Sequence, residues 1–211
     1  MNKGATRPIP RPAPSLAARG TAWALVLTAV LLATSPARAD AQAATSPAAL
    51  GRKALALLAR ADYAALLPST CAPGGLSFSP YARNLASLSP VQLAADDLRR
   101  FASHPDKRIW GRYDGSGADI VLTPRAYHAQ FVYDVDYQRR ARATLRSPAA
   151  LKADAELSAL AGAYPGAGLV IYRDPGTRRN DFKDARELIM VVRPVGKRWC
   201  LQGLSHSEDS V

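Results

Sequence analysis

Two apolar runs near the C-terminus place the strongest constraint on how this chain can fold. Residues 187–193 and 198–204 are rich in β-branched and large apolar side chains, which favour strands. Only the short segment 194–197, which contains Pro194 and Gly196, connects them. A connection this short cannot cross over a sheet, so the two runs must pair as an antiparallel hairpin.

Further strand signals precede this hairpin. Residues 107–113 and 118–123 flank Asp114-Gly-Ser-Gly117, and these glycines tolerate the positive φ angles of a tight turn, which predicts a second hairpin. Residues 168–172 form another apolar run with the length of a strand. Most of the predicted sheet therefore lies in the second half of the chain.

Helix starts are marked by a hydroxyl residue directly before proline. The hydroxyl caps free N–H groups, and proline fits the first helical position. This pattern occurs at Ser46-Pro47, Ser89-Pro90, Thr123-Pro124 and Ser147-Pro148. Asp62 is expected to cap a short second helix that ends at Pro68. Helices first and a closing sheet predict an α+β fold, with N-terminal helices packed on one face of an antiparallel sheet.

Residues 1–39 have the layout of a cleavable secretory signal. This segment is basic and has no acidic residue, it contains an apolar run at 21–33, and Ala37-Arg-Ala39 supplies small residues two apart. The alternative is a membrane anchor, but the uncharged stretch is about 17 residues long, at the low edge of what crosses a bilayer. We expect cleavage after Ala39, and no cysteine follows the run to carry a lipid.

The remaining chain is expected to form one domain. We predict a flexible N-terminus at 40–46, a single α+β domain at 47–206 and a short tail at 207–211. With 48% hydrophobic and 21% charged residues, the chain is neither a disordered polyampholyte nor a polytopic membrane protein. No later segment resembles a transmembrane span, so the sequence predicts a periplasmic or secreted protein.

The chain contains two cysteines, Cys71 and Cys200. In an oxidising compartment an even pair favours a disulfide over free thiols. The alternative is two unpaired buried thiols.

Several phrases together resemble a known group of proteins. They are Leu76-Ser-Phe-Ser-Pro-Tyr-Ala82, Ile109-Trp-Gly-Arg-Tyr-Asp-Gly-Ser-Gly117, Phe131-Val-Tyr-Asp134 and Trp199-Cys-Leu-Gln-Gly-Leu-Ser-His206. In this order they resemble a family of uncharacterised exported bacterial proteins, often lipoproteins, with a small α+β domain that ends on a Trp-containing hairpin followed by His. The helix, the Asp-capped short helix and the long final hairpin also resemble the NTF2-like (cystatin-like) fold. That resemblance implies a curved, cone-like sheet.

The resemblance directs attention to His206, since it places a histidine at this position. If the last strand continues so far, its two-residue period puts His206 on the same face as Cys200, Gln202 and Leu204. Tyr133 and Asp134 follow the helix predicted from Pro124. We therefore expect a pocket with four ligand-binding residues. They are His206, Asp134, Tyr133 and Trp110.

Other candidate motifs carry less weight. Asp134 and Asp136 share a face in an extended segment, as a metal or acid/base pair would, but Arg139 and Arg140 beside them favour a solvated ion-pair surface. Gly203-Leu-Ser-His206 lacks the second glycine of a nucleophile elbow. Residues 114–119 have too few oxygen ligands for a calcium loop. We predict no metal site, no cofactor and no catalytic residue.

Arginines form a basic cluster after Asp136. The cluster comprises Arg139, Arg140, Arg142 and Arg146. In an exported protein such a cluster would meet envelope phosphates, acidic glycans or anionic head groups rather than nucleic acid. The alternative is an ordinary solvated face.

The sequence thus favours an exported, non-catalytic protein that binds a small ligand or an envelope component between sheet and helices. The alternative is a small enzyme of cone-like fold in which His206 acts with Asp134 or Tyr133 as an acid/base pair. A third possibility is a pure interaction module that uses the arginine cluster.

Overall fold

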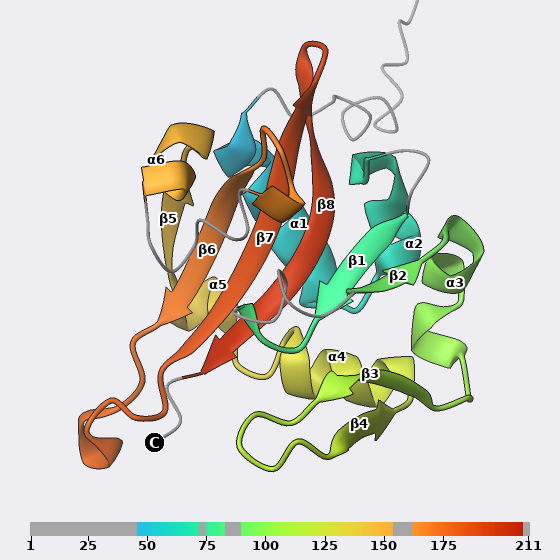
Figure 1. Ribbon diagram of the computed structural model, residues 1–211, viewed down its shortest axis with the longest axis vertical. Coiled ribbons are helices and arrows are strands. Elements are labelled where there is room, and N and C mark those ends of the chain that lie inside the picture. Colours follow the sequence, from blue (N-terminus) through green and yellow to red (C-terminus); the bar gives the residue numbers. More distant parts are fainter. Residues whose placement is uncertain (1–45, 72–74, 83–89, 154–161, 209–211) are drawn as a thin grey trace, which may run out of the picture. The chain divides into compact units, whose positions relative to one another are not determined.

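The computed structural model describes residues 46–71, 75–82, 90–153 and 162–208 (Figure 1). The chain divides into two units, Met1–Ala39 and Asp40–Val211, and all described residues belong to the second. The boundary coincides with the predicted cleavage site, and cleavage itself stays a prediction. The predicted signal segment, residues 40–45, the end of the predicted C-terminal tail and the predicted Ser89 cap lie outside the described residues.

The described strands form two sheets, which confirms the α+β class. The larger sheet has the order β2-β1-β8-β7-β6-β5, and the smaller consists of β3 and β4. The pairs in both sheets are antiparallel except for β1 and β8, which are parallel. The strands are β1 (Leu76–Ser79), β2 (Val91–Leu93), β3 (Arg108–Arg112), β4 (Asp119–Leu122), β5 (Arg142–Arg146), β6 (Gly168–Asp174), β7 (Arg186–Val195) and β8 (Arg198–Glu208). The larger sheet is not strongly curled (Figure 1). The cone-like form that the resemblance implies is therefore not confirmed and stays a prediction.

Three of the four predicted helix caps are present. The hydroxyls of Ser46, Thr123 and Ser147 accept hydrogen bonds from the backbone N–H three residues later. Asp62 caps the short second helix through Ala65 N. The helices are α1 (Pro47–Leu58), α2 (Tyr63–Leu66), α3 (Ala95–Arg99), α4 (Pro124–Phe131), α5 (Tyr137–Arg140) and α6 (Pro148–Ala153), with 3-10 turns η2 (Leu67–Ser69), η4 (Phe101–Ser103) and η5 (Arg178–Asn180).

The helix predicted to start at Pro90 is wrong in its first turn. Residues 91–93 form β2 instead, because they pair with β1 through Leu76↔Leu93 and Phe78↔Val91. The helical part, α3, begins only at Ala95. Tertiary pairing here overrides the local helix-start signal.

The two faces of the larger sheet carry cores of different size. Helix α1 packs against β6 and β8 on one face, and Gly51 allows this approach, since a Cβ there would lie 2.7 Å from Cγ1 of Val170. An aromatic cluster extends this core, with Trp110 stacked on Tyr127 at 4.0 Å between ring centroids. The opposite face carries a smaller cluster. It comprises Leu151, Tyr164, Ala167, Leu169, Ile171, Ile189 and Val191.

Strand β8 continues through His206 to Glu208, but it contains a β-bulge. Val191 pairs with Gly203 whereas Val192 pairs with Leu201, so Gln202 is the extra residue. The bulge reverses the alternation of side chains. Leu201 and Leu204 consequently face the same core, and the prediction that Cys200 shares a face with Leu204 is wrong.

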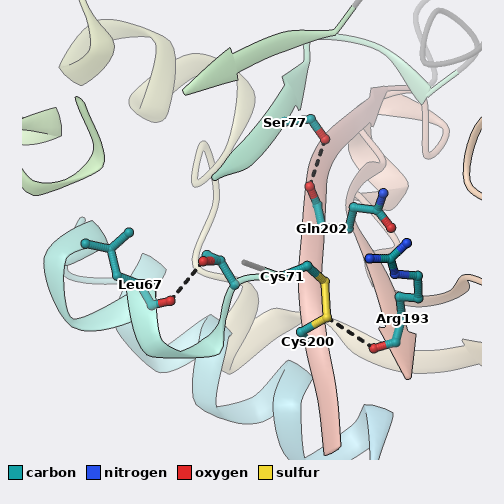
Figure 2. Close-up of a disulfide and its surroundings, with 7 residues drawn as sticks. Leu67, Cys71, Ser77, Arg193, Cys200 and Gln202 are labelled. Carbon is teal, nitrogen blue, oxygen red and sulfur yellow. Dashed lines mark hydrogen bonds between the residues drawn. A yellow bond between two sulfur atoms is a disulfide. The ribbon is translucent and has the colours of Figure 1, made fainter. Parts of the chain in front are cut away.

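The predicted disulfide between Cys71 and Cys200 is present (Figure 2). The two Cα atoms lie 5.0 Å apart, within the range that a disulfide spans. The bond fixes the segment after η2 to the beginning of β8, where Cys71 N also donates to the carbonyl oxygen of Leu201. The disulfide indicates an oxidising, non-cytoplasmic compartment. Within the described ranges, no helix is long and apolar enough to cross a membrane.

Candidate ligand-binding site

The structure brings His206 and Asp134 together. His206 lies near the end of β8 and is only 1% exposed, and its Nε2 atom is 3.2 Å from Oδ2 of Asp134. A carboxylate can only accept, so Nε2 carries the proton. Phe131 places its ring against the imidazole at 6.0 Å between centroids, in an edge-on arrangement. His206 and Asp134, which the sequence analysis placed in one site, therefore form a direct contact.

Asp134 is also bonded to two further residues. The hydroxyl of Tyr137 donates to Oδ1 at 2.8 Å, and Nε of Arg186 lies 3.3 Å from Oδ2. Burial raises the pKa of Asp134, but the hydrogen bond and charge of His206 and the hydrogen bond from Tyr137 outweigh this effect and hold the pKa below its usual value. We call Asp134, Tyr137, Arg186 and His206 the carboxylate cluster.

Within the carboxylate cluster, the imidazole of His206 is closed to a substrate. Nε2 of His206 is occupied by Asp134, and Nδ1 is buried without a hydrogen-bond partner in the described part of the chain. An open depression of about 420 Å³ exposes Asp134, Arg186 and Glu208, but the imidazole is not part of its lining. Neither ring nitrogen can therefore reach a bound molecule in this conformation, as acid/base catalysis requires.

The other two predicted residues lie apart from this contact. The hydroxyl of Tyr133 donates to Asp136 rather than to the His206 pair, at 3.2 Å. Trp110 is 1% exposed in the aromatic cluster, and its Nε1–H donates to the carbonyl oxygen of Leu122. Both have local structural partners, and ligand contact by either residue stays a prediction.

Asp136 and the arginines of the basic cluster have different structural roles. Asp136 caps α5 by accepting from Arg139 N, so it does not pair with Asp134. Arg140 forms an ion pair with Asp174 at 2.9 Å. Arg142 and Arg146 are exposed on β5. The described residues contain no group of three or more His, Cys, Asp or Glu side chains placed to hold a metal ion.

A second histidine, His128, is part of the aromatic core. Its Nδ1 atom lies 2.8 Å from the hydroxyl of Tyr63, and the two rings meet edge to face. Burial lowers the pKa of His128 to about 4, so the imidazole is neutral at physiological pH. It serves the packing of α2 against α4.

A larger pocket lies between α1, α5 and the outer strands β5 and β6. Its volume is about 490 Å³, within the range of small-molecule sites. Its apolar walls are formed by Ala48, Leu55, Ala141, Ala143, Leu145 and Val170. Four side chains with polar groups complete the lining, namely Arg52, Tyr137, Gln138 and Tyr172. We call this cavity the α1–β5 pocket.

Local structure explains how these residues meet. Ala48, Arg52 and Leu55 recur at helical spacing on one face of α1. On β5, Ala143 and Leu145 point to the pocket because they pair with Tyr172 and Val170, whose side chains face the α1 core. Leu145 is 52% exposed, which leaves apolar surface uncovered at the pocket.

Tyr137 connects the pocket to the carboxylate cluster. Its ring lines the pocket, while its hydroxyl donates to Asp134. Burial, followed by the charge and hydrogen bond of Asp134, raises the pKa of Tyr137 well above its usual value, so the hydroxyl stays protonated. Asp134 and His206, which the sequence singled out, are therefore connected to the pocket by Tyr137, which it did not single out.

Sequence reasoning missed Arg52, Gln138 and Tyr172. Arg52 has the pattern of any solvated residue on an amphipathic helix, and Tyr172 that of any strand residue. One signal was available for α5, because Asp136 stands three residues before Arg139, at the distance of an N-cap bond. That signal predicts a helical turn that presents Tyr137 and Gln138.

Comparison of the chain with protein-family models, with curated proteins and with solved structures finds no match.

Proposed function

We propose that this protein is an exported, non-catalytic binding protein that holds a small, largely apolar ligand in the α1–β5 pocket. The observation that carries the proposal is the pocket itself, with about 490 Å³ of space, mostly apolar walls and a few convergent polar groups. The exposed side chain of Leu145 supports it, since a bound apolar group would cover that surface.

The proposal includes export to the periplasm or the exterior, with residues 1–39 removed as a signal. The disulfide supports it, because such bonds persist in oxidising compartments. We also propose that the fold is of the NTF2-like kind and that the chain is akin to the exported family which its sequence phrases resemble. The helix α1, the Asp62-capped α2 and the long closing hairpin of β7 and β8, on which the likeness rests, support this.

One observation favours an enzyme as a second candidate, namely the 3.2 Å contact between His206 and Asp134. A histidine oriented by a carboxylate is a frequent element of catalytic sites. The burial of both ring nitrogens weighs against it, and so does the saturation of the carboxylate by Tyr137 and Arg186.

The binding proposal is tested with an uncharged fluorescent probe, N-phenyl-1-naphthylamine, whose emission rises in apolar surroundings. Ala143→Trp would fill the pocket from the exposed strand β5 and should weaken probe binding about tenfold, a loss of roughly 1.4 kcal/mol. Thr144→Trp is the matched control, because Thr144 pairs with Ile171 and faces the other side of the sheet.

The expected result is saturable emission enhancement in the wild type and in Thr144→Trp, with the loss confined to Ala143→Trp. No saturable enhancement in the wild type, or equal binding by both variants, would contradict the proposal.

A further inference from the structure

Among the described residues that line the α1–β5 pocket, Arg52 is the one with a charged side chain. It is exposed on α1 and has no ion pair with the described residues, and the described lining residues include no carboxylate. By contrast, Arg140, Arg173 and Arg186 of the neighbouring elements each face an acidic partner. The pocket therefore contains the positive charge of Arg52, and its described lining residues supply no negative charge to pair with it.

Apolar side chains line the pocket beside Arg52 on both the helix and the sheet. Leu55 lies one turn further along α1, and Val170 and Leu145 pair across β6 and β5. Leu145 supplies most of the area left to cover, since Leu55 and Val170 are only 6% and 1% exposed, and burying such area contributes about 25 cal/mol per Å². A ligand that covers these residues would have a hydrocarbon portion and would end near the guanidinium.

Neutral hydrogen-bonding groups flank the charge. The exposed side-chain amide of Gln138 lies at the pocket, and the hydroxyl of Tyr172 lies 3.1 Å from the Cβ position of Gly51, next to Arg52. Burial raises the pKa of Tyr172 and the charge of Arg52 counteracts this, in keeping with a guanidinium close to the hydroxyl. Tyr137 offers only its ring, because its hydroxyl is used by Asp134.

We infer that the ligand of this pocket is a single-chain amphiphile with an anionic head group, a carboxylate or a phosphate, which Arg52 binds while the hydrocarbon chain covers Leu55, Val170 and Leu145. The inference rests on the proposed function and adds the chemical class of the ligand. A planar guanidinium pairs with the two oxygens of either head group, which a neutral head group cannot match.

The test is displacement of the neutral probe by three ligands of equal chain length, used below their micelle-forming concentrations at pH 8. They are dodecanoate, dodecyl phosphate and uncharged dodecanol. We expect the anions to displace the probe at about tenfold lower concentration than the alcohol, which corresponds to roughly 1.4 kcal/mol for one charge-assisted interaction. A greater potency of one anion over the other distinguishes a phosphate-bearing from a carboxylate-bearing natural ligand.

Arg52→Gln should abolish this preference and leave displacement by dodecanol unchanged. Arg142→Gln is the control, since Arg142 lies on β5 between two lining residues but pairs with Arg173 on the opposite face. Its preference for anions should equal that of the wild type.

The outcomes separate the two proposals. Equal displacement by all three ligands in the wild type would overturn the anionic head group and leave the apolar pocket standing. If Arg52→Gln keeps the preference for anions over dodecanol, or if Arg142→Gln loses it equally, the role of Arg52 would be overturned. A probe that no dodecyl ligand displaces would contradict the proposed function itself.

Discussion

Two regions of the molecule meet at Tyr137 and differ in how their polar groups are satisfied. On the closed side, which comprises the carboxylate cluster and the disulfide at the start of β8, Asp134 is bonded to His206, Tyr137 and Arg186, although Nδ1 of His206 has no partner among the described residues. On the open side, the α1–β5 pocket, Arg52 and the exposed Leu145 face solvent. Charges that satisfy each other stabilise a fold, whereas unsatisfied groups around an apolar hollow are suited to a ligand.

This difference reverses the emphasis that the sequence suggested. The most conspicuous chemical pair, His206 and Asp134, lies on the closed side, and the candidate site lies where residues of ordinary appearance meet. Substitutions on the closed side should therefore change stability with little effect on ligand affinity. Substitutions on the open side should do the opposite.

The largest effect is expected from removing the disulfide. The double substitution of Cys71→Ala and Cys200→Ala frees a loop spanning a sequence separation of 129 residues and should lower the free energy of unfolding by about 4 kcal/mol. Denaturation by urea measures this loss. Probe affinity at a temperature where the variant is still folded should stay within about twofold of wild type. A stability loss below about 1 kcal/mol would show that the bond is not a main support of the fold.

Asp134→Ala should have the next largest effect. It leaves the donors of His206, Tyr137 and Arg186 without their shared acceptor, at a cost of about 3 kcal/mol. Asp136→Ala is the matched control, because that carboxylate caps an exposed turn and its removal should cost about 1 kcal/mol. Equal losses of unfolding free energy in urea denaturation would contradict the prediction that Asp134 stabilises the fold more than Asp136 does.

The third effect is a pH dependence set by His128. Its pKa is about 4 in the folded protein and 6.5 when unperturbed, so between these values the unfolded state binds more protons. The contribution of His128 to stability should therefore fall by about 3 kcal/mol as the pH drops from 7 to 4. His128→Asn keeps an acceptor near the Nδ1 position for Tyr63 and should show a shallower fall over this range. Identical profiles of variant and wild type would contradict the assignment.

The smallest effect on stability is expected on the open side. Leu145→Ser removes an exposed apolar side chain and should change the free energy of unfolding by less than about 0.5 kcal/mol. Probe binding should nevertheless weaken about threefold, because the substitution removes apolar wall from the pocket. A large loss of stability without a change in binding would place Leu145 on the closed side.

Much of the architecture was predictable from local physical chemistry. The caps at Ser46, Thr123 and Ser147 start helices as expected, and the short turn at Gly196 fixes the hairpin of β7 and β8. The exceptions depend on distant contacts. Pro90 does not start a helix, because β1 recruits the following residues, and all five residues of β5 are exposed and lack the alternation that marks a strand.

The candidate site was less predictable than the fold for the same reason. The sequence could suggest that Asp134 and His206 meet, because the family resemblance singled out His206 and Asp134 follows the helix predicted from Pro124. It could not suggest the pocket, because Arg52 lines a cavity only when α1 and β5 lie close together in the folded protein. The bulge at Gln202 likewise cannot be read from strand periodicity, and it decides which residues of β8 face the core.

Hydrogen–deuterium exchange with and without saturating dodecanoate tests the central claim most directly, since it shows where a ligand binds without altering the protein. The comparison predicts slower exchange in α1 and in residues 137–146, with little change in residues 203–208 around His206. Protection centred on His206 and Asp134, with none in α1 or β5, would contradict the account and make the carboxylate cluster the ligand site.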